Sequence, residues 1–196
     1  MLEEKLHGHQ ILLASASPRR QQFFTEMGIP FTVHKIPVDE IYPEHLKGQQ
    51  IPNYLAKLKA LPFKDILGEK DILITSDTVV WHKDTSLAKP RDGQEAMEML
   101  RTLSDDWHQV ITSVCFTSSI DQKVVTRATQ VKFRKLEEAE IQYYVNNYKP
   151  FDKAGGYGIQ EWIGLIGIEE IRGSYPNVVG LPTQLVYETL MAMIVS

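Results

Sequence analysis

The sequence has a single cysteine, no long hydrophobic run and no excess of basic residues. One cysteine, Cys115, excludes an internal disulfide and is typical of a reducing compartment. Its neighbours Val114 and Phe116 are apolar, so we expect it in the core. No early segment is as long and apolar as a signal peptide or a membrane span. We therefore expect a soluble cytoplasmic protein that has no membrane partner.

The charge balance is mildly acidic, with 21 Lys and Arg against 25 Asp and Glu and a net charge of −4. Proteins that bind nucleic acid broadly are usually basic, because the phosphate backbone attracts cations. The balance argues against a nucleic-acid partner, and any phosphate-binding function should use a local pocket. Two common nucleotide-binding motifs are also missing, since the sequence contains neither a Walker A motif nor a G-x-G-x-x-G fingerprint.

The 196 residues alternate between helical and extended patterns, without an internal repeat, a low-complexity tract or a linker. This length suits one large domain or two lobes that share a core. The alternation favours an α/β fold with a mixed sheet. The patterns predict strands at 11–13, 31–36, 72–74, 107–117, 123–133 and 163–171, and helices at 18–27, 51–61, 93–103, 137–144 and from 182 onward.

The stretch from Leu12 to Arg20 joins the first predicted strand to the first predicted helix. Ser17 is a good N-cap residue, and Pro18 suits the first helical position. Arg19 and Arg20 then fall in the first turn, where the helix dipole disfavours a cation by about 0.3–1 kcal/mol. Serine hydroxyls, unpaired N–H groups and two cations would together receive a phosphate there. The alternative is that both arginines simply point into solvent.

Asp77 follows the buried run at 72–74, where open α/β sheets bind their ligands. The alternative is that Asp77 caps a local turn. Six charged residues at expected loop ends would suit a polyphosphate and a divalent ion: Arg19, Arg20, Glu40, Lys59, Asp77 and Lys89. Mg²⁺ is usually bound by one or two carboxylates together with substrate phosphates. Such a set favours phosphoryl chemistry, although spacing alone does not bring the six residues together.

Five motifs, in this order, resemble the Maf family of nucleoside triphosphate pyrophosphatases and span nearly the whole chain. They are Ser15–Arg20, Ser76–Val80, Lys89–Pro90, Asp152–Gln160 and Asn177–Pro182. The resemblance implies a single Maf-like domain over residues 1–196. It also implies a Maf/ITPase-like α/β fold, with an elongated mixed β-sheet flanked by helices and two lobes around a central cleft.

The same resemblance implies a hydrolase that converts a nucleoside triphosphate to monophosphate and pyrophosphate with a divalent metal cation, Mg²⁺ or Mn²⁺. Asp77 would be the catalytic residue that activates water, and Glu40 and Asp77 would hold the metal. The implied phosphate-binding residues are Ser17, Arg20, Lys59 and Lys89. The implied specificity residues are Arg19, Thr78 and Gln160.

The run Ala154–Gln160 resembles the branch of the family that acts on dTTP and UTP. A house-cleaning role would follow, extending to modified pyrimidine nucleotides and limiting their misincorporation. An amide such as Gln160 can read a pyrimidine edge through one donor and one acceptor. Two positions depart from the family pattern: Glu161 replaces a small residue, and Ala88 replaces a glycine. We expect the first departure to bear on the base pocket.

Two other functions stay open. One is a pyrophosphatase for 7-methylguanosine triphosphate, a branch that differs at the equivalents of residues 157–160. The other is a non-catalytic nucleotide sensor in cell-division control, although the retained Glu40, Asp77 and Lys89 argue against an inactive protein. Family members often pair, so the resemblance also implies a homodimer.

Overall fold

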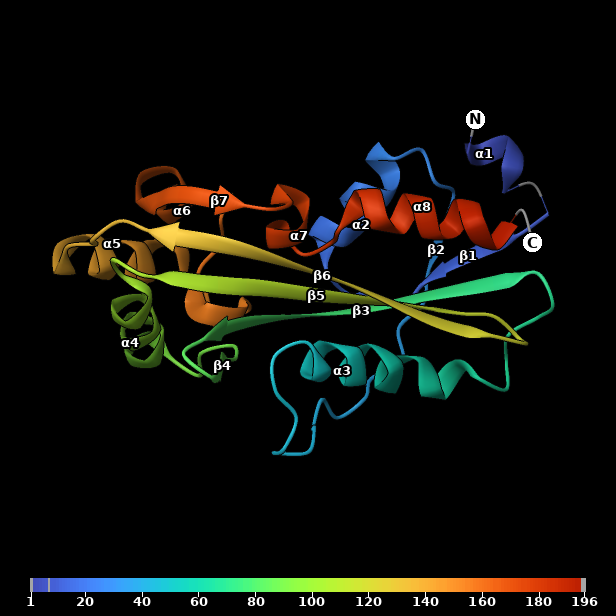
Figure 1. The fold of residues 1–196 in the computed structure, drawn as a ribbon, viewed down its shortest axis with the longest axis horizontal. Coiled ribbons are helices and arrows are strands. Elements are labelled where there is room, and N and C mark those ends of the chain that lie inside the picture. Colours follow the sequence, from blue (N-terminus) through green and yellow to red (C-terminus); the bar gives the residue numbers. More distant parts are fainter. Residues whose placement is uncertain (1, 7, 195–196) are drawn as a thin grey trace. The chain divides into compact units, whose positions relative to one another are not determined.

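The protein, seen in a computed structural model that describes residues 2–6 and 8–194, contains one mixed seven-stranded sheet flanked by helices (Figure 1). The strands are β1 (Gln10–Leu13), β2 (Thr32–Val33), β3 (Asp71–His82), β4 (Thr85–Leu87), β5 (Trp107–Thr117), β6 (Gln122–Phe133) and β7 (Ile168–Arg172). Their hydrogen-bonded order is β2-β1-β3-β5-β6-β7, and β4 pairs with β3. β1 pairs in parallel with β2 and β3, whereas β4 and β7 pair antiparallel to their neighbours. The predicted mixed α/β fold is confirmed.

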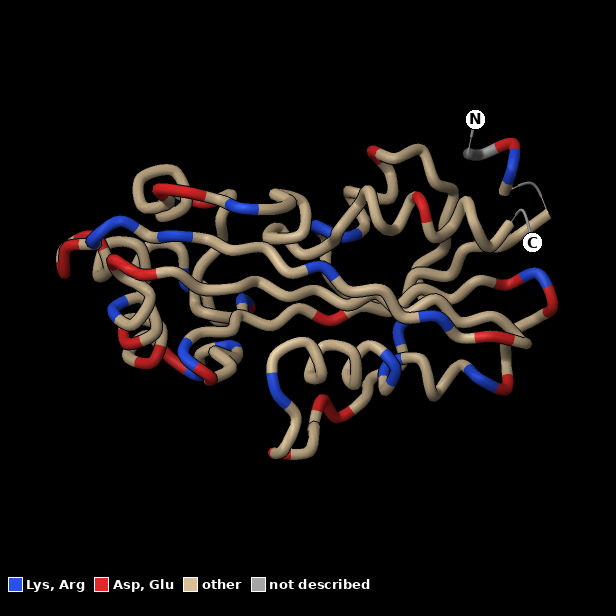
Figure 2. The backbone as a smooth tube through the Cα atoms, in the orientation of Figure 1, with Lys and Arg blue, Asp and Glu red and all other residues tan. Residues whose placement is uncertain are grey.

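The helices alternate with these strands along the chain. They are α1 (Leu2–Lys5), α2 (Pro18–Glu26), α3 (Gln50–Ala60), α4 (Gly93–Leu103), α5 (Glu138–Tyr148), α6 (Trp162–Gly167), α7 (Tyr175–Val179) and α8 (Thr183–Ile194), with 3₁₀ turns η1 (Leu61–Phe63) and η2 (Ala154–Gly156). Within the described residues, no helix is long and apolar enough to cross a membrane. Figure 2 shows basic and acidic segments interspersed along the described backbone.

The chain divides into two compact units. The first unit contains the residues up to Asp77, Thr112–Arg127 and the residues from Gly180 onward. The second contains Thr78–Ile111 and Ala128–Val179. Each of β3, β5 and β6 gives one part of its length to each unit. Two units agree with the expected two lobes; the cleft and the single-domain assignment stay predictions.

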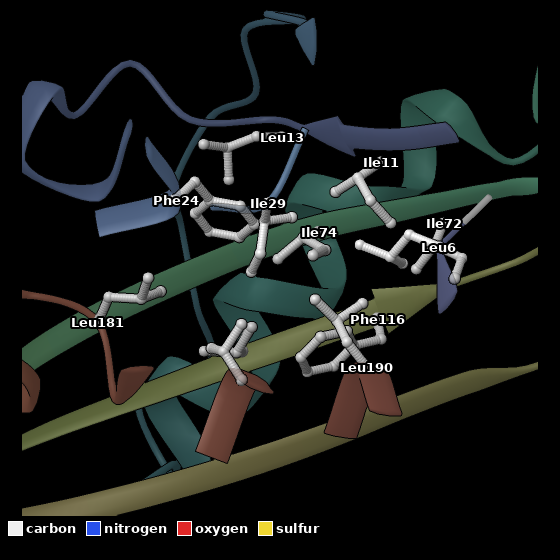
Figure 3. Packing of buried hydrophobic residues seen from close by; sticks show 12 residues of the cluster. Leu6, Ile11, Leu13, Phe24, Ile29, Ile72, Ile74, Phe116, Leu181 and Leu190 are labelled. Atoms are coloured by element: carbon white, nitrogen blue, oxygen red, sulfur yellow. The ribbon is translucent and has the colours of Figure 1, made fainter. Parts of the chain in front are cut away.

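The first unit has a core on each face of its strands, because successive strand side chains point to opposite faces. On one face, strand residues pack with the helices α2 and α8 (Figures 1 and 3): Ile11, Leu13, Ile72, Ile74, Val114 and Phe116 contact Phe24, Val186 and Leu190. On the other face, Leu12, Leu73 and Cys115 pack with Ala56 and Ala60 of α3. The predicted core position of Cys115 is confirmed.

The second unit contains the helix predicted at 93–103, which is α4 and is capped by Asp92. Asp92 Oδ1 accepts a hydrogen bond of 2.9 Å from Glu95 N, and α4 begins at Gly93, directly after Asp92. The apolar stripe of α4 is buried: Ala96, Met99, Leu100 and Leu103. This face of α4 packs against α5 and η2, so the glycine-rich segment lies against a helix whose position the cap fixes.

Three predicted strands are wrong in extent or type. The strand expected at 72–74 is part of β3, which continues to His82. The strand expected at 31–36 covers only β2, whose two side chains are exposed. The strand expected at 163–171 is α6 followed by β7. The carbonyl oxygen of Glu161 accepts hydrogen bonds from the N–H groups of Gly164 and Leu165, and this starts a helix. A short apolar run does not by itself distinguish a strand from a buried helix.

Candidate active site

The N-terminus of α2 forms as the sequence predicts. Ser17 Oγ accepts a hydrogen bond of 3.4 Å from Arg20 N, and Ser15 Oγ accepts one of 3.2 Å from Ser17 N. α2 begins at Pro18, and the chain leaves it through Gly28, whose φ of 65° is left-handed. The N-cap prediction is confirmed, and the strand-to-helix junction is held by two serine hydroxyls.

Arg20 is held by two backbone carbonyl groups rather than pointing into solvent. Its Nε donates to Gly180 O at 2.9 Å, and its Nη1 donates to Ser76 O at 3.0 Å. Burial lowers the pKa of the Arg20 guanidinium from its ordinary value, while the Asp77 carboxylate raises it and the Arg19 guanidinium lowers it. An arginine stays charged in proteins, so the clamped guanidinium presents a fixed positive charge beside Asp77.

Arg19 lies next to this charge and is half-buried. Its Nε is buried and has no hydrogen-bond partner among the described residues. A buried N–H donor without an acceptor is unfavourable by about 1–3 kcal/mol. An anionic or carbonyl group of a ligand would satisfy this donor, which is consistent with a binding role for Arg19.

Lys59 joins the two carboxylates that the sequence singled out. Its Nζ lies 2.7 Å from Asp77 Oδ1 and 3.1 Å from Glu40 Oε2. The Asp77 side chain is 9% exposed, whereas the Glu40 side chain is 45% exposed. The cluster therefore has a buried carboxylate, an exposed carboxylate and one ammonium between them.

Asp77 lies inside β3, which continues to His82, so the prediction that it follows the end of a strand is wrong, and so is the alternative that it caps a turn. Thr75, two residues earlier, lies on the same face of the strand and donates from Oγ1 to Ala56 O of α3 at 2.6 Å. The Thr75 hydroxyl is thus hydrogen-bonded within the protein, and the polar residues continue the strand instead of ending it. The same period-2 alternation directs Asp77 toward α3 and Lys59.

The spacing within the helix predicted at 51–61 places Tyr54, Leu55 and Leu58 on its apolar face, and this prediction is wrong in part. Leu55 is buried as expected, but Tyr54 is 39% exposed. The buried residues also include Ile51 and Ala56. Lys59 lies one turn after Leu55 and Ala56 on this side of the helix, and it therefore lies near β3. The helix uses its small residues against the sheet, where they allow close packing, and this brings the Lys59 ammonium to Asp77.

The donor set of this cluster suits a hard divalent cation. Within the part of the chain that the structure describes, no three His, Cys, Asp or Glu side chains gather into a metal site. Glu40 and Asp77 instead converge on one ammonium, which gives two carboxylates with oxygen donors only. Such a pair fits Mg²⁺ or Mn²⁺ when phosphate oxygens and water supply the remaining ligands.

The predicted residues divide between the two units. Ser17, Arg19, Arg20, Glu40, Lys59 and Asp77 belong to the first unit, where the contacts above bring them together. Thr78, Lys89 and Gln160 belong to the second unit. Thr78 is half-buried in β3, whereas Lys89 and Gln160 are exposed. The roles of all nine residues, and the approach of these three to the others, stay predictions.

Sequence reasoning missed the carbonyl groups that position Arg20. The signal was present in the Asn177–Pro182 motif, to which the sequence assigned no role. Gly180 has a φ of 128°, a conformation that favours glycine, and its carbonyl oxygen meets Arg20. In the second unit, Asn177 Nδ2 donates to Val110 O at 2.9 Å and to Thr129 Oγ1 at 3.0 Å. The Asn177–Pro182 motif therefore has a structural role through the hydrogen bonds of the Asn177 side chain and the Gly180 carbonyl group.

The backbone of the glycine-rich segment lies close to neighbouring side chains of the second unit. A Cβ on Gly155 would lie 3.0 Å from Val80 of β3, and its φ is 72°. Tyr157 is buried against Phe133, and its hydroxyl lies 2.7 Å from His108 Nε2. Burial raises the pKa of Tyr157, so its hydroxyl stays protonated. This tyrosine packs inside the second unit, whereas Gln160 is exposed.

Comparison with known proteins shows the family of the chain. The family model for Maf-like proteins matches residues 10–193. The chain is 56% identical to a dTTP/UTP pyrophosphatase of Christiangramia forsetii, over 99% of both chains. It is 48% identical to a dTTP/UTP pyrophosphatase of Flavobacterium johnsoniae, over 99% of this chain and 100% of that protein.

A solved structure, the Ham1 protein of Staphylococcus aureus, is similar in fold. The TM-score is 0.52 at 12% identity, over 94% of this chain and 99% of that chain. The family match and the two relatives cover nearly every residue discussed above. The chain therefore belongs to the Maf family.

Proposed function

We propose that this protein hydrolyses dTTP and UTP, and modified pyrimidine nucleoside triphosphates, to the monophosphate and pyrophosphate. The observation that carries the proposal is the Lys59 ammonium bound to both Asp77 and Glu40, in the same unit as the clamped Arg20. The relatives named dTTP/UTP pyrophosphatases support the substrate class. Removing these pyrimidine nucleotides, the modified ones included, would limit their misincorporation.

Asp77 is the general base in this proposal. Its carboxylate accepts a proton from water as the water oxygen bonds to phosphorus. The bond from the α-phosphorus to the oxygen that bridges the α- and β-phosphates breaks, and the leaving pyrophosphate keeps the electron pair. General-base catalysis of this kind typically contributes about 10²–10⁴-fold. The nearly buried position of Asp77 beside Lys59 keeps the base in one orientation.

The cations of the site neutralise the triphosphate. Arg20, whose guanidinium is oriented by Gly180 and Ser76, suits a phosphate oxygen because its planar fork donates two hydrogen bonds. Lys59 and Lys89 act as point charges on neighbouring phosphates, and Ser17 donates at the N-terminus of α2. Positioning and charge stabilisation dominate the catalysis of phosphoryl transfer.

Glu40 and Asp77 would hold the divalent cation, Mg²⁺ or Mn²⁺. When bound, the cation draws electron density from the phosphate oxygens and so stabilises the charge that develops during hydrolysis. Arg19, Thr78 and Gln160 select the base. The Gln160 amide has one donor and one acceptor for a pyrimidine edge. The homodimer stays a prediction from the family resemblance, and the cytoplasmic location stays a prediction from the sequence.

A nucleotide panel tests the proposal. Purified protein is assayed with dTTP, UTP, dCTP, GTP and 7-methylguanosine triphosphate, with Mg²⁺ or Mn²⁺, and both pyrophosphate and the nucleoside product are identified. We expect the highest kcat/KM for dTTP and UTP. A higher value for 7-methylguanosine triphosphate would replace the substrate assignment. Nucleotide binding without pyrophosphate release under every metal would identify a sensor.

The variant Asp77→Asn tests the base. We expect kcat to fall about 10²–10⁴-fold, because an amide cannot accept the proton. The fold should survive, since the amide oxygen can still accept from Lys59. Asp84→Asn is the matched control, because Asp84 is an exposed carboxylate in the turn between β3 and β4. Near-normal turnover by Asp77→Asn would show that another group accepts the proton.

A further inference from the structure

We propose that Glu161 is a positioning residue for base selection: with Tyr144 and Lys153 it fixes the backbone that presents Gln160. The inference rests on the proposed function, in which Gln160 reads the base. Its observations lie wholly within the second unit. They concern Glu161, the charged residue directly after the glycine-rich motif, where the family pattern has a small residue.

Glu161 connects the residues on both sides of Gln160. Its Oε2 accepts a hydrogen bond from the Tyr144 hydroxyl. The same hydroxyl accepts the N–H of Gly158 at 3.0 Å. Tyr144 therefore joins the backbone two residues before Gln160 to the side chain one residue after it. Burial and the bond to Glu161 raise the pKa of Tyr144, so the hydroxyl keeps the proton that it donates.

Lys153 adds the charge that makes this arrangement stable. Its Nζ lies 2.9 Å from Glu161 Oε1, and its side chain is only 10% exposed. A buried ammonium requires a counter-charge, because desolvation disfavours it strongly. Asp152 also pairs with Lys153 at 2.7 Å, but its side chain is 68% exposed. Glu161, at 25% exposed, is thus the more buried partner of the lysine.

Packing leaves the loop little freedom to place Gln160 elsewhere. Residues 155–159 are all buried, and Gln160 is the first exposed residue after them. A Cβ on Gly158 would lie 2.8 Å from Glu161 Cδ, so the glycine makes room for the carboxylate. A Cβ on Gly164 would lie 1.9 Å from Ile159 O, which shows how closely α6 approaches the loop.

These contacts assign Glu161 an indirect role. Each of its carboxylate oxygens is bonded within the protein, one to Tyr144 and one to Lys153, so the side chain acts on the substrate through the loop. A site built to hydrogen-bond its substrate discriminates best when the supporting residues hold it rigidly. A small residue at 161 would supply neither the acceptor nor the counter-charge. This chain therefore orients Gln160 with an ion pair.

The experiment compares base selectivity in four variants, Glu161→Gly, Glu161→Gln, Tyr144→Phe and Gln160→Ala, and in each of the first three combined with Gln160→Ala. Steady-state kinetics with dTTP and dCTP give kcat and KM separately. The Gln variant keeps an acceptor for Tyr144 but loses the charge, so it should lie between wild type and the Gly variant. Thermal unfolding of every variant reports the folded fraction.

We expect Glu161→Gly and Tyr144→Phe to raise KM for dTTP about tenfold with kcat within about twofold, and to lower the dTTP-to-dCTP ratio of kcat/KM about tenfold. In the Gln160→Ala background the same changes should have no further effect on the ratio, because coupled residues are not additive. Glu170→Gln is the control, since that exposed carboxylate pairs with Arg172 in the same unit.

Three results would overturn the inference. In the first, Gln160→Ala lowers the selectivity ratio but the Glu161 and Tyr144 variants leave it unchanged. In the second, the Glu161 variants lower the ratio equally with and without Gln160. In the third, they lower kcat equally for both nucleotides. The proposed function fails separately, when the wild-type protein releases no pyrophosphate from dTTP or UTP.

Discussion

The Nε of Arg20 donates to the carbonyl oxygen of Gly180 at 2.9 Å, across 160 positions of the chain. This bond, with the one to Ser76 O, explains how a cation occupies the first turn of a helix. The helix dipole disfavours that placement, but two carbonyl groups outside the helix attract the guanidinium. The two carbonyl groups therefore fix the orientation of the Arg20 side chain within the fold itself.

The substitution Arg20→Lys should lower kcat/KM for dTTP about 10–100-fold. A lysine keeps the charge but cannot donate to both carbonyl groups and to phosphate with a planar fork. Losing one or two hydrogen bonds to a charged group corresponds to about 1.5–3 kcal/mol. Steady-state kinetics measure the change. Arg127→Lys, which only alters a contact with Gln184, should leave kcat/KM unchanged; equal losses in both variants would contradict the clamp.

The substitution Lys59→Met should lower the free energy of unfolding by about 3 kcal/mol at pH 7. It leaves the nearly buried Asp77 carboxylate without its ammonium partner. Urea unfolding followed by circular dichroism measures the loss. The double variant Lys59→Met with Asp77→Asn should recover much of it, because the Asp77 carboxylate that lost its ammonium partner is then absent.

Lys83 provides the matched control for that measurement. Its Nζ lies 2.7 Å from Asp106, the same distance as in the Lys59–Asp77 pair, but its side chain is 74% exposed. Exposed ion pairs contribute at most about 1 kcal/mol. Lys83→Met should therefore be nearly neutral. Comparable losses for Lys59→Met and Lys83→Met would argue against burial as the cause.

The substitution Gly164→Ala should destabilise the protein by about 3 kcal/mol. Its Cβ would lie 1.9 Å from Ile159 O and 2.5 Å from Ile159 C, so backbone must move. Gly93→Ala is the control, because its Cβ would meet only Val145 Cγ1 at 3.5 Å and alanine favours the helix. Chemical unfolding of both variants measures the difference, and an unchanged Gly164→Ala protein would refute the close approach.

Stability should fall below about pH 6.5 in a manner that depends on His108. Burial, and then nearby His82, lower the pKa of His108 from 6.5 to about 3. Between these values the unfolded chain binds a proton that the folded chain does not, so unfolding becomes more favourable as pH falls. The contribution approaches about 1.4 kcal/mol per pH unit.

Urea unfolding at pH 7 and pH 5 tests this dependence. The variant His108→Gln lacks the titrating group and keeps an amide that can bond to the Tyr157 hydroxyl. It should lose less stability between the two pH values than the wild type. His45→Gln, at an exposed position, should behave as the wild type does. A wild-type pH dependence in His108→Gln would assign the effect to other groups.

Local chemistry in the sequence determined much of the fold. Ser17 and Pro18 start α2 through local contacts, because capping needs only neighbouring N–H groups. Asp92 does the same for α4. The alternation of side chains along β1, β3 and β5 likewise follows from strand geometry alone, and it produced the two cores of the first unit.

Tertiary structure decided what local patterns left ambiguous. The apolar run after Gln160 suits a strand or a helix, and close packing of Gly164 on Ile159 selected the helix. The polar run through Asp77 suits a turn or a strand, and the bond from Thr75 to α3 selected the strand. Each choice depends on a partner that is distant in the chain or on a close approach of backbone.

The sequence by itself determined the motifs, the residue types of the site and most of its helices and strands. Only the tertiary structure decided that Lys59 bridges Glu40 and Asp77, and that Gly180 orients Arg20. It also decided that Glu161 bonds Tyr144 and Lys153. The reason is physical: spacing along a chain sets which face a residue occupies, but packing of distant segments sets which residue it meets.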